Sequence, residues 1–151
     1  GRNEITGGTV SPSYISPIQG LQRLQRIMDE YVGGIATNYM TNENMLNRGL
    51  ELLKWLEEDL ENVGAEDYHQ LMRAWELKHR TVTSQCVTEH TKFRKETRWP
   101  GYYYRGDHLK LDDENWHCLT VSRRDPVTKE FKMEKVPVYH IVDEKKEKKA
   151  S

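Results

Sequence analysis

The sequence has little of what marks several large protein classes. Two of its 151 residues are cysteines, Cys86 and Cys118, which is too few for a disulfide framework and favours a reducing, cytoplasmic compartment. No apolar run approaches the roughly 20 residues that a membrane-spanning helix needs, so membrane insertion is not expected. Basic residues number 23 and acidic residues 24, and this near-neutral balance argues against a general nucleic-acid-binding protein.

Motifs that point directly to nucleotide chemistry are also missing. Neither Gly7-Gly8 nor Gly33-Gly34 has the strand–turn–helix context of a phosphate-binding loop, and the sequence contains no Gly-x-Gly-x-x-Gly. The chain has no initiator methionine, and its first 13 residues are polar rather than an apolar leader. We therefore expect a fragment, or a mature piece, of a longer chain.

The patterns that are present predict a mainly α-helical fold. The predicted helices run from Ser16 to Gly33, from Thr41-Asn42 to Gly64, and from Asp67 to a point before Pro100. Each begins at a residue type that caps helix N-termini, and the first two end at glycines. Only Ala65 and Glu66 separate the last two helices, so these must be antiparallel neighbours. Residues 16–96 therefore predict a three-helix antiparallel bundle, preceded by an extended lead-in over residues 1–15.

Each predicted helix carries apolar residues at steps of three and four, the spacing of one helical face. In the third helix this stripe comprises Tyr68, Leu71, Trp75, His79, Val82, Cys86, His90 and Phe93. We therefore expect Trp75 to share the bundle core with Leu24 and Leu53. On that interpretation, replacing Trp75 by alanine costs roughly 3–5 kcal/mol.

Residues 97–142 have a different texture. The string from Trp99 to Gly106 cannot form a regular helix, because it combines Pro100 and Gly101 with three consecutive tyrosines. Residues 116–121 and 131–138 then alternate in polarity around a turn-forming stretch, which predicts a β-hairpin packed on the bundle. Residues 143–151 are nearly all charged and are expected to fray. The predicted fold class is mainly α: a three-helix antiparallel bundle, an irregular aromatic segment and a C-terminal β-hairpin.

Cys86 and His90 lie one helical turn apart, and with His117 and Cys118 they offer the ligand types that zinc prefers. Their spacing matches no standard zinc motif, and both helical residues lie on the predicted apolar stripe, where such residues commonly pack. Cys86 also lies in mid-helix, away from the helix N-terminus that would activate a thiolate. Packing is the better interpretation, so we assign no metal ligand.

An acidic cluster precedes the predicted hairpin. It comprises Asp107, Asp112, Asp113 and Glu114. Paired carboxylates act as acid and base only where their environments separate their pKa values. In an exposed stretch we interpret these residues as a solvated turn, or as intrachain partners for Arg98 and Arg105.

The segment that precedes this cluster interleaves aromatic and basic residues. Trp, Tyr and Arg are typical anchors of protein–protein contacts, and aromatic residues also stack on single-stranded nucleic acid. The near-neutral net charge favours packing or a protein interface. The candidate interface comprises Arg98, Trp99, Tyr102, Tyr103, Tyr104, Arg105 and Trp116.

The same region carries an ordered set of motifs. In chain order they are Leu71–Leu77, Glu96-Thr97-Arg98, Arg105-x-Asp107 and Asp112–Trp116. In this order they resemble the C-terminal helical domain of the succinate dehydrogenase and fumarate reductase flavoprotein family. The string Trp99–Tyr104 departs from the shorter link of that family and is similar to one branch of it, the alpha subunits of dissimilatory adenylylsulfate reductase.

The resemblance implies a function for a larger protein rather than for this piece. Members of that branch hold FAD in flavin and capping domains that precede the helical domain. They reduce adenylylsulfate to sulfite and AMP together with a beta subunit that carries 4Fe–4S clusters. Those domains are not in this sequence, so we carry over no catalytic or cofactor-binding residue and expect the fragment alone to be colourless and inactive.

The resemblance therefore implies a structural role, in which the domain braces the flavin domain and offers surface to the partner subunit. The low hydrophobic content of 36% fits a domain whose packing is completed by others. The alternative is a free-standing helical module that binds a protein or a nucleic acid through the candidate interface.

Overall fold

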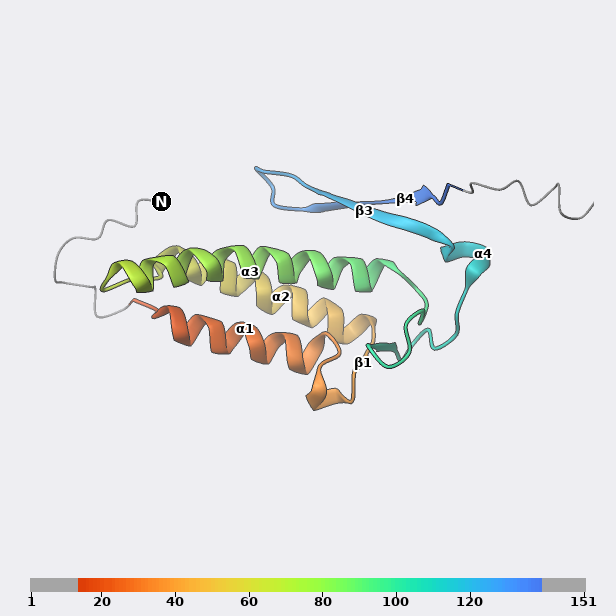
Figure 1. Ribbon diagram of the computed structural model, residues 1–151, viewed down its shortest axis with the longest axis horizontal. Helices are drawn as coiled ribbons and strands as arrows, with labels where there is room; N and C mark the ends of the chain where they lie inside the picture. Colours follow the sequence, from red (N-terminus) through yellow and green to blue (C-terminus); the bar gives the residue numbers. More distant parts are fainter. Residues whose placement is uncertain (1–13, 140–151) are drawn as a thin grey trace, which may run out of the picture.

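The computed structural model describes residues 14–139 (Figure 1). Its elements are α1 (Pro17–Tyr31), η1 (Ile35–Thr37), β1 (Met40–Thr41), α2 (Glu43–Asp59), η2 (Leu60–Asn62), α3 (Tyr68–Phe93), β2 (Tyr104–Arg105), α4 (Asp113–Trp116), β3 (Cys118–Arg124) and β4 (Phe131–Pro137). The predicted fold class is confirmed, with the short helix α4 added before the hairpin. The charged tail, and all but the last two residues of the expected lead-in, lie outside the described residues.

The three long helices begin at the capping residues that the sequence predicted. Ser16 accepts a hydrogen bond from the Gln19 backbone N–H, and the Gln19 side chain accepts one from the Ser16 N–H, which completes a capping box. Asn42 and Asp67 cap α2 and α3 in the same way through their side-chain oxygens. The N-termini of all three helices therefore follow from local sequence.

The helix ends differ more from expectation. The first helix ends at Tyr31, just before Gly33, whose φ of 89° is in the left-handed region. The second ends at Asp59 and tightens into the 3₁₀ turn η2 before Gly64. The third ends at Phe93, well before Pro100, because Arg94 is already extended with ψ of 106°.

The helices alternate in direction, so that α2 runs antiparallel to both α1 and α3 (Figure 1). The core between them consists of Leu24, Ile27, Leu53, Leu56, Leu60, Val63, Ala74 and Leu77. Leu24 and Leu53 occupy the places that the sequence predicted. No helix among the described residues has the length and hydropathy of a membrane-spanning segment.

The predicted orientation of the third helix is wrong. Trp75 is 53% exposed, and α3 instead buries Ala74, Leu77, Thr81, Gln85 and Thr88. The reason is the close approach of the helices: a Cβ at Gly20 of α1 would lie 2.5 Å from Leu77 Cδ2, which leaves no room for an indole. The buried hydroxyl of Thr81 is satisfied by the Leu77 carbonyl at 2.9 Å, so a threonine can take a core position there.

The hairpin of β3 and β4 lies along α3, on the side away from α1 (Figure 1). The strands are antiparallel, with Cys118 opposite Pro137 and Arg124 opposite Phe131. Asp125 shapes the turn between them by accepting hydrogen bonds from the N–H groups of Val127 and Thr128 at 2.8 and 2.7 Å. The predicted hairpin is therefore present.

Candidate contact surface

Arg105 lies at the end of the bundle where α3 stops, and it is fully buried. Its Nη1 donates to the carbonyl oxygens of Thr91, Lys92 and Arg94 at 2.6, 3.0 and 3.0 Å. Carbonyls in the last turn of a helix have no partner within the helix, and a cation there is stabilised by the helix dipole. Arg105 therefore caps the C-terminus of α3 from outside the helix.

Asp107 connects this cap to the start of α2. Its two carboxylate oxygens accept hydrogen bonds from Nε and Nη2 of Arg105, both at 2.9 Å, and it also accepts the backbone N–H of Glu43 at 3.0 Å. These bonds, chiefly those from Arg105, lower the pKa of Asp107 from 3.8 to about 2, although burial acts in the opposite direction. The carboxylate is therefore ionised at neutral pH and joins the ends of two helices.

Glu96 forms a second buried node just after α3. Its fully buried carboxylate accepts hydrogen bonds from Arg94 at 2.6 Å, from Arg98 at 2.7 and 3.1 Å, and from the Asp112 backbone N–H at 3.0 Å. Burial alone would raise the pKa of Glu96, but these hydrogen bonds outweigh it and the pKa is lowered. Arg98 also reaches Asp113 at 2.8 Å, so the acidic cluster supplies partners for both predicted arginines.

The ion pairs that Glu96 and Asp107 form with Arg98 and Arg105 lie on either side of the aromatic turn, residues 99–104, and we call them the polar base of this turn. The Tyr102 N–H donates to the Trp99 carbonyl at 3.1 Å, and Gly101 has a φ of 95° that favours glycine. Tyr104 then donates to the Tyr39 carbonyl at 2.7 Å, within a short parallel pairing of β1 with β2. The turn is therefore fixed at both ends while its tip points to solvent.

Large apolar side chains gather around this end of the molecule. They are Ile35, Tyr39, Met40, Trp99, Tyr102, Leu109 and Leu111, all exposed, and we call them the loop-end surface. They come from the segments that flank β1 and β2, which lie together at one end of the bundle (Figure 1). Exposed apolar side chains in neighbouring segments are typical of surfaces that contact another protein segment.

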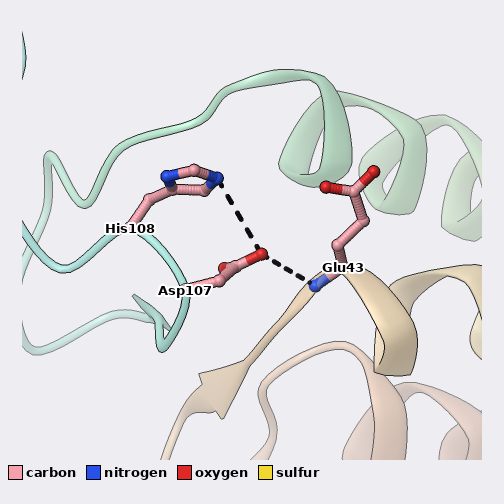
Figure 2. A group of neighbouring side chains, drawn as sticks. All are labelled: Glu43, Asp107 and His108. Carbon is pink, nitrogen blue, oxygen red and sulfur yellow. Dashed lines mark hydrogen bonds and ion pairs between the residues drawn. The ribbon is translucent and has the colours of Figure 1, made fainter.

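Glu43, Asp107 and His108 also lie together at this end (Figure 2). Among the described residues they are the one group of at least three side chains with metal-ligand spacing. Figure 2 shows Asp107 facing the backbone N–H of Glu43, with His108 Nε2 3.9 Å from its carboxylate. Because Arg105 and Glu43 already engage this carboxylate, the group acts as a helix junction, and we assign no metal to it.

The structure does not bring Cys86, His90, His117 and Cys118 into one ligand set. His90 instead bridges α3 to β3, with Nδ1 3.1 Å from Thr120 Oγ1 and Nε2 2.9 Å from Ser122 Oγ. Burial, followed by the nearby Arg94 charge, lowers the pKa of His90, so the ring is neutral at pH 7. These contacts hold the hairpin on the bundle.

Comparisons with known proteins identify the family to which the chain belongs. Residues 21–149 match the family described as fumarate reductase flavoprotein C-term. The chain belongs to this family. It is 44% identical over 142 residues to the adenylylsulfate reductase subunit alpha of Megalodesulfovibrio gigas, covering 94% of this chain and 21% of that protein. It is also 30% identical over 94 residues to an uncharacterized FAD-dependent oxidoreductase of Methanocaldococcus jannaschii, covering 62% of this chain and 16% of that protein.

Solved structures agree with this placement in the fumarate reductase flavoprotein C-terminal family. Adenylylsulfate reductase from Archaeoglobus fulgidus matches with a TM-score of 0.85 and 56% identity, over 91% of this chain and 22% of that one. E. coli quinol fumarate reductase matches with a TM-score of 0.72 and 20% identity, over 91% of this chain and 22% of that one, which shows a common fold. The chain thus spans about a fifth of the length of these relatives.

In this member of the fumarate reductase flavoprotein C-terminal family, the predicted interface residues divide into three sets by their exposure. Trp99 and Tyr102 are 64% and 79% exposed and belong to the loop-end surface. Arg105 and Trp116 are buried inside the chain. The ring of Trp116 meets the edge of another aromatic ring, and Lys135 Nζ lies 3.6 Å from its centroid.

The remaining predicted interface residues, Arg98, Tyr103 and Tyr104, are half-buried. Burial raises the pKa of Tyr103, so this tyrosine stays protonated at neutral pH. The sequence did not reveal the part played by Glu96, nor that of Thr97, whose hydroxyl accepts the Arg105 backbone N–H at 3.0 Å and donates to the His108 carbonyl at 2.9 Å. The available signal was their place in the Glu96-Thr97-Arg98 motif, directly before the aromatic turn.

Proposed function

We propose that this chain is the C-terminal structural and contact domain of an FAD-dependent adenylylsulfate reductase. The intact enzyme, in the cytoplasm, would reduce adenylylsulfate to sulfite and AMP in dissimilatory sulfur metabolism. The observation that carries the proposal is the likeness to adenylylsulfate reductase at 56% identity and a TM-score of 0.85 over 91% of the chain. The match to the alpha subunit of M. gigas, over 94% of the chain, supports it independently.

In such an enzyme the FAD would be held by other domains of the same chain. A dinucleotide cradle needs a parallel sheet whose first strand leads through a Gly-rich turn into a helix. The described residues form only two-stranded sheets, and the parallel one has two residues per strand. These residues do not fit FAD, so we derive no catalytic step from them. FAD belongs to the missing flavin and capping domains, and 4Fe–4S clusters to the beta subunit.

In this proposal the function of the domain is to contact the other parts of the enzyme. We assign the loop-end surface to the interface with the rest of the enzyme, because its exposed aromatic side chains stand on a rigid polar base. Trp and Tyr dominate the residues that anchor protein interfaces, and anchors that are already ordered lose little entropy on binding. Trp99 and Tyr102 are the anchors that we expect to matter most.

The proposal is tested in the full-length subunit that contains this chain, combined with its beta subunit. We expect the wild-type complex to form sulfite and AMP from adenylylsulfate. Trp99→Ala/Tyr102→Ala should weaken assembly, measured as lower flavin content and less co-purified beta subunit. A matched control is Tyr68→Ala/Trp75→Ala, which removes the same exposed residue types from α3, away from the loop-end surface.

Three results would contradict the proposal. A wild-type complex with full flavin and cluster content that does not act on adenylylsulfate would refute the enzyme assignment. Equal assembly of the Trp99/Tyr102 variant and its control would refute the contact assignment. The 151-residue chain alone should be colourless, and purification of it with near-stoichiometric flavin would contradict the division between this domain and the flavin-binding ones.

A further inference from the structure

A cleft of about 580 Å³ opens between α2, α3 and the hairpin, and it shares no residue with the loop-end surface. Leu50 and Phe131 give it apolar walls, and Gln85, Glu89, Glu57 and Arg124 give it polar ones. Its lining includes five carboxylates, on Glu51, Glu57, Glu58, Glu89 and Glu130, against three cationic groups, on Lys54, Arg124 and Lys129. The cleft is therefore acidic overall.

The amide of Gln85 leaves one acceptor unused in this cleft. The side chain is nearly buried, at 6% exposure, and its Nε2 donates to Glu57 at 2.9 Å. Its Oε1 is buried and has no hydrogen-bond partner among the described residues. The amide cannot simply be turned round, because that would set Oε1 against the Glu57 carboxylate. Buried acceptors in proteins are nearly always hydrogen-bonded, so Gln85 Oε1 needs a donor.

Glu89 provides a second unused acceptor, one helical turn further along α3. It is half-buried, and within residues 14–139 it forms no hydrogen bond or ion pair. Burial raises the pKa of Glu89, and the nearby Lys92 charge only partly offsets this. Glu57 is different, because Arg124 donates to both of its oxygens at 2.9 and 2.8 Å.

Side chains four residues apart lie on the same helix face, and Gln85 and Glu89 both line the cleft from α3. We propose that the cleft binds an organic cation with an aliphatic stem, an alkylguanidinium or an alkylammonium. Its N–H groups would donate to Gln85 Oε1 and to the Glu89 carboxylate, and its stem would lie against Leu50 and Phe131.

The test is a titration of the ¹⁵N-labelled 151-residue chain, followed by NMR. The probes are butylguanidinium and butylammonium, with butylurea as the neutral control of the same shape. We expect saturable shifts of the Gln85 side-chain amide and of the backbone around Leu50 and Phe131 with both cations. Butylurea should produce no such shifts.

Glu89→Gln should weaken binding of the cations about tenfold, because the glutamine oxygen still accepts a hydrogen bond but no longer carries the charge that strengthens it. Glu114→Gln is the matched control, since Glu114 is an exposed glutamate outside the cleft. Glu89→Gln also removes a partly buried charge, so it should not impair folding. Equal affinities of the two variants would overturn the proposal, as would the absence of saturable shifts or equal shifts with butylurea.

The cation could be a basic side chain of a polypeptide or a free diamine, and two further probes distinguish between them. A capped Gly-Arg-Gly peptide that binds more tightly than butylguanidinium identifies a basic side chain of a polypeptide. Putrescine that binds more tightly than butylammonium identifies a free diamine. The titration requires only the folded chain, so its failure would leave the reductase assignment untouched.

Discussion

Replacing Arg105 by methionine should destabilise the chain by about 3 kcal/mol. The first part comes from Asp107, whose pKa falls from 3.8 to about 2 on folding, chiefly through Arg105. Each pKa unit corresponds to about 1.4 kcal/mol at most, but Asp107 is exposed and solvent screens its charge, so loss of this shift costs about 1.5–2 kcal/mol. The second part comes from the three carbonyls at the end of α3 that lose their donor, for which about 1–2 kcal/mol in total is reasonable, because water replaces some of the bonds. The sum lies within the range measured for breaking buried ion pairs.

The pH dependence separates these two parts. Because the pKa of Asp107 is lower in the folded than in the unfolded chain, its contribution is fully present above about pH 4 and is lost as the pH falls through about 2. The stability gap between wild type and Arg105→Met should therefore narrow by about 1 kcal/mol between pH 6 and pH 2.5. The gap that remains at pH 2.5 belongs mostly to the helix carbonyls, which do not titrate, and in smaller part to Asp107, which is still partly ionised at that pH because its pKa is about 2.

Urea unfolding followed by circular dichroism measures both effects, with the midpoint and the slope determined at each pH. Arg123→Met is the control, because Arg123 is an exposed arginine on β3. It should change stability by less than about 0.5 kcal/mol. A loss of less than about 1 kcal/mol for Arg105→Met at pH 6, or a gap that does not change with pH, would refute the role assigned to this side chain.

Three further predictions concern the bundle and the cleft. Leu53→Ala should cost about 2–5 kcal/mol because Leu53 is fully buried, whereas Trp75→Ala should cost less than about 1 kcal/mol; thermal unfolding of both variants checks the orientation of α3. Gly34→Ala should cost about 1–3 kcal/mol, since its Cβ would overlap the Asp29 backbone at Cα, and equal melting temperatures of variant and wild type would exclude this close contact. Glu89→Gln should stabilise the chain at pH 7 but not at pH 3, because a carboxyl with a raised pKa disfavours folding only when ionised; a gain at both pH values would contradict the assigned cause.

Local signals allowed the helix starts to be predicted. Ser16, Asn42 and Asp67 each satisfy backbone N–H groups within three residues, so the information lies in a short stretch of sequence. The turn of the hairpin is predictable for the same reason, since Asp125 bonds its own neighbours. The ion pairs of Arg98 and Arg105 also have local partners, in the acidic cluster that follows them.

The orientation of α3 could not be predicted in this way. Apolar side chains occur on several of its faces, and the face that is buried was selected by the neighbouring helices. Gly20 lets α1 approach Leu77 closely, and Thr81 fits the core because its hydroxyl bonds the preceding turn. A prediction from apolar spacing assigns Trp75 to the core and threonine to the surface. It therefore predicts the wrong buried face when the space between the helices is narrow.

The candidate contact surface depends on pairings that span long stretches of chain. Strand β1 meets β2 more than sixty residues later, through a register of only two residue pairs, and no local pattern encodes this. The burial of Arg105 follows from that pairing, because it brings the arginine beneath the end of α3. Composition alone placed this residue in the interface with Trp99 and Tyr102, since nothing in the local sequence distinguishes a buried arginine from an exposed one.

At the loop-end surface, the arginines hold the turn in place and the exposed aromatic residues are free to contact a partner. Arg98 and Arg105 lie at the two ends of the aromatic turn. The buried carboxylate of Glu96 holds Arg98, and the carboxylate of Asp107 holds Arg105. A turn fixed at both ends keeps the side chains at its tip in a narrow range of positions before any partner arrives, so less conformational entropy is lost on binding. Weakening this base by Glu96→Gln, with Trp99 and Tyr102 intact, should therefore reduce assembly of the full-length enzyme. If assembly depended on the exposed side chains alone, the variant would assemble like the wild type.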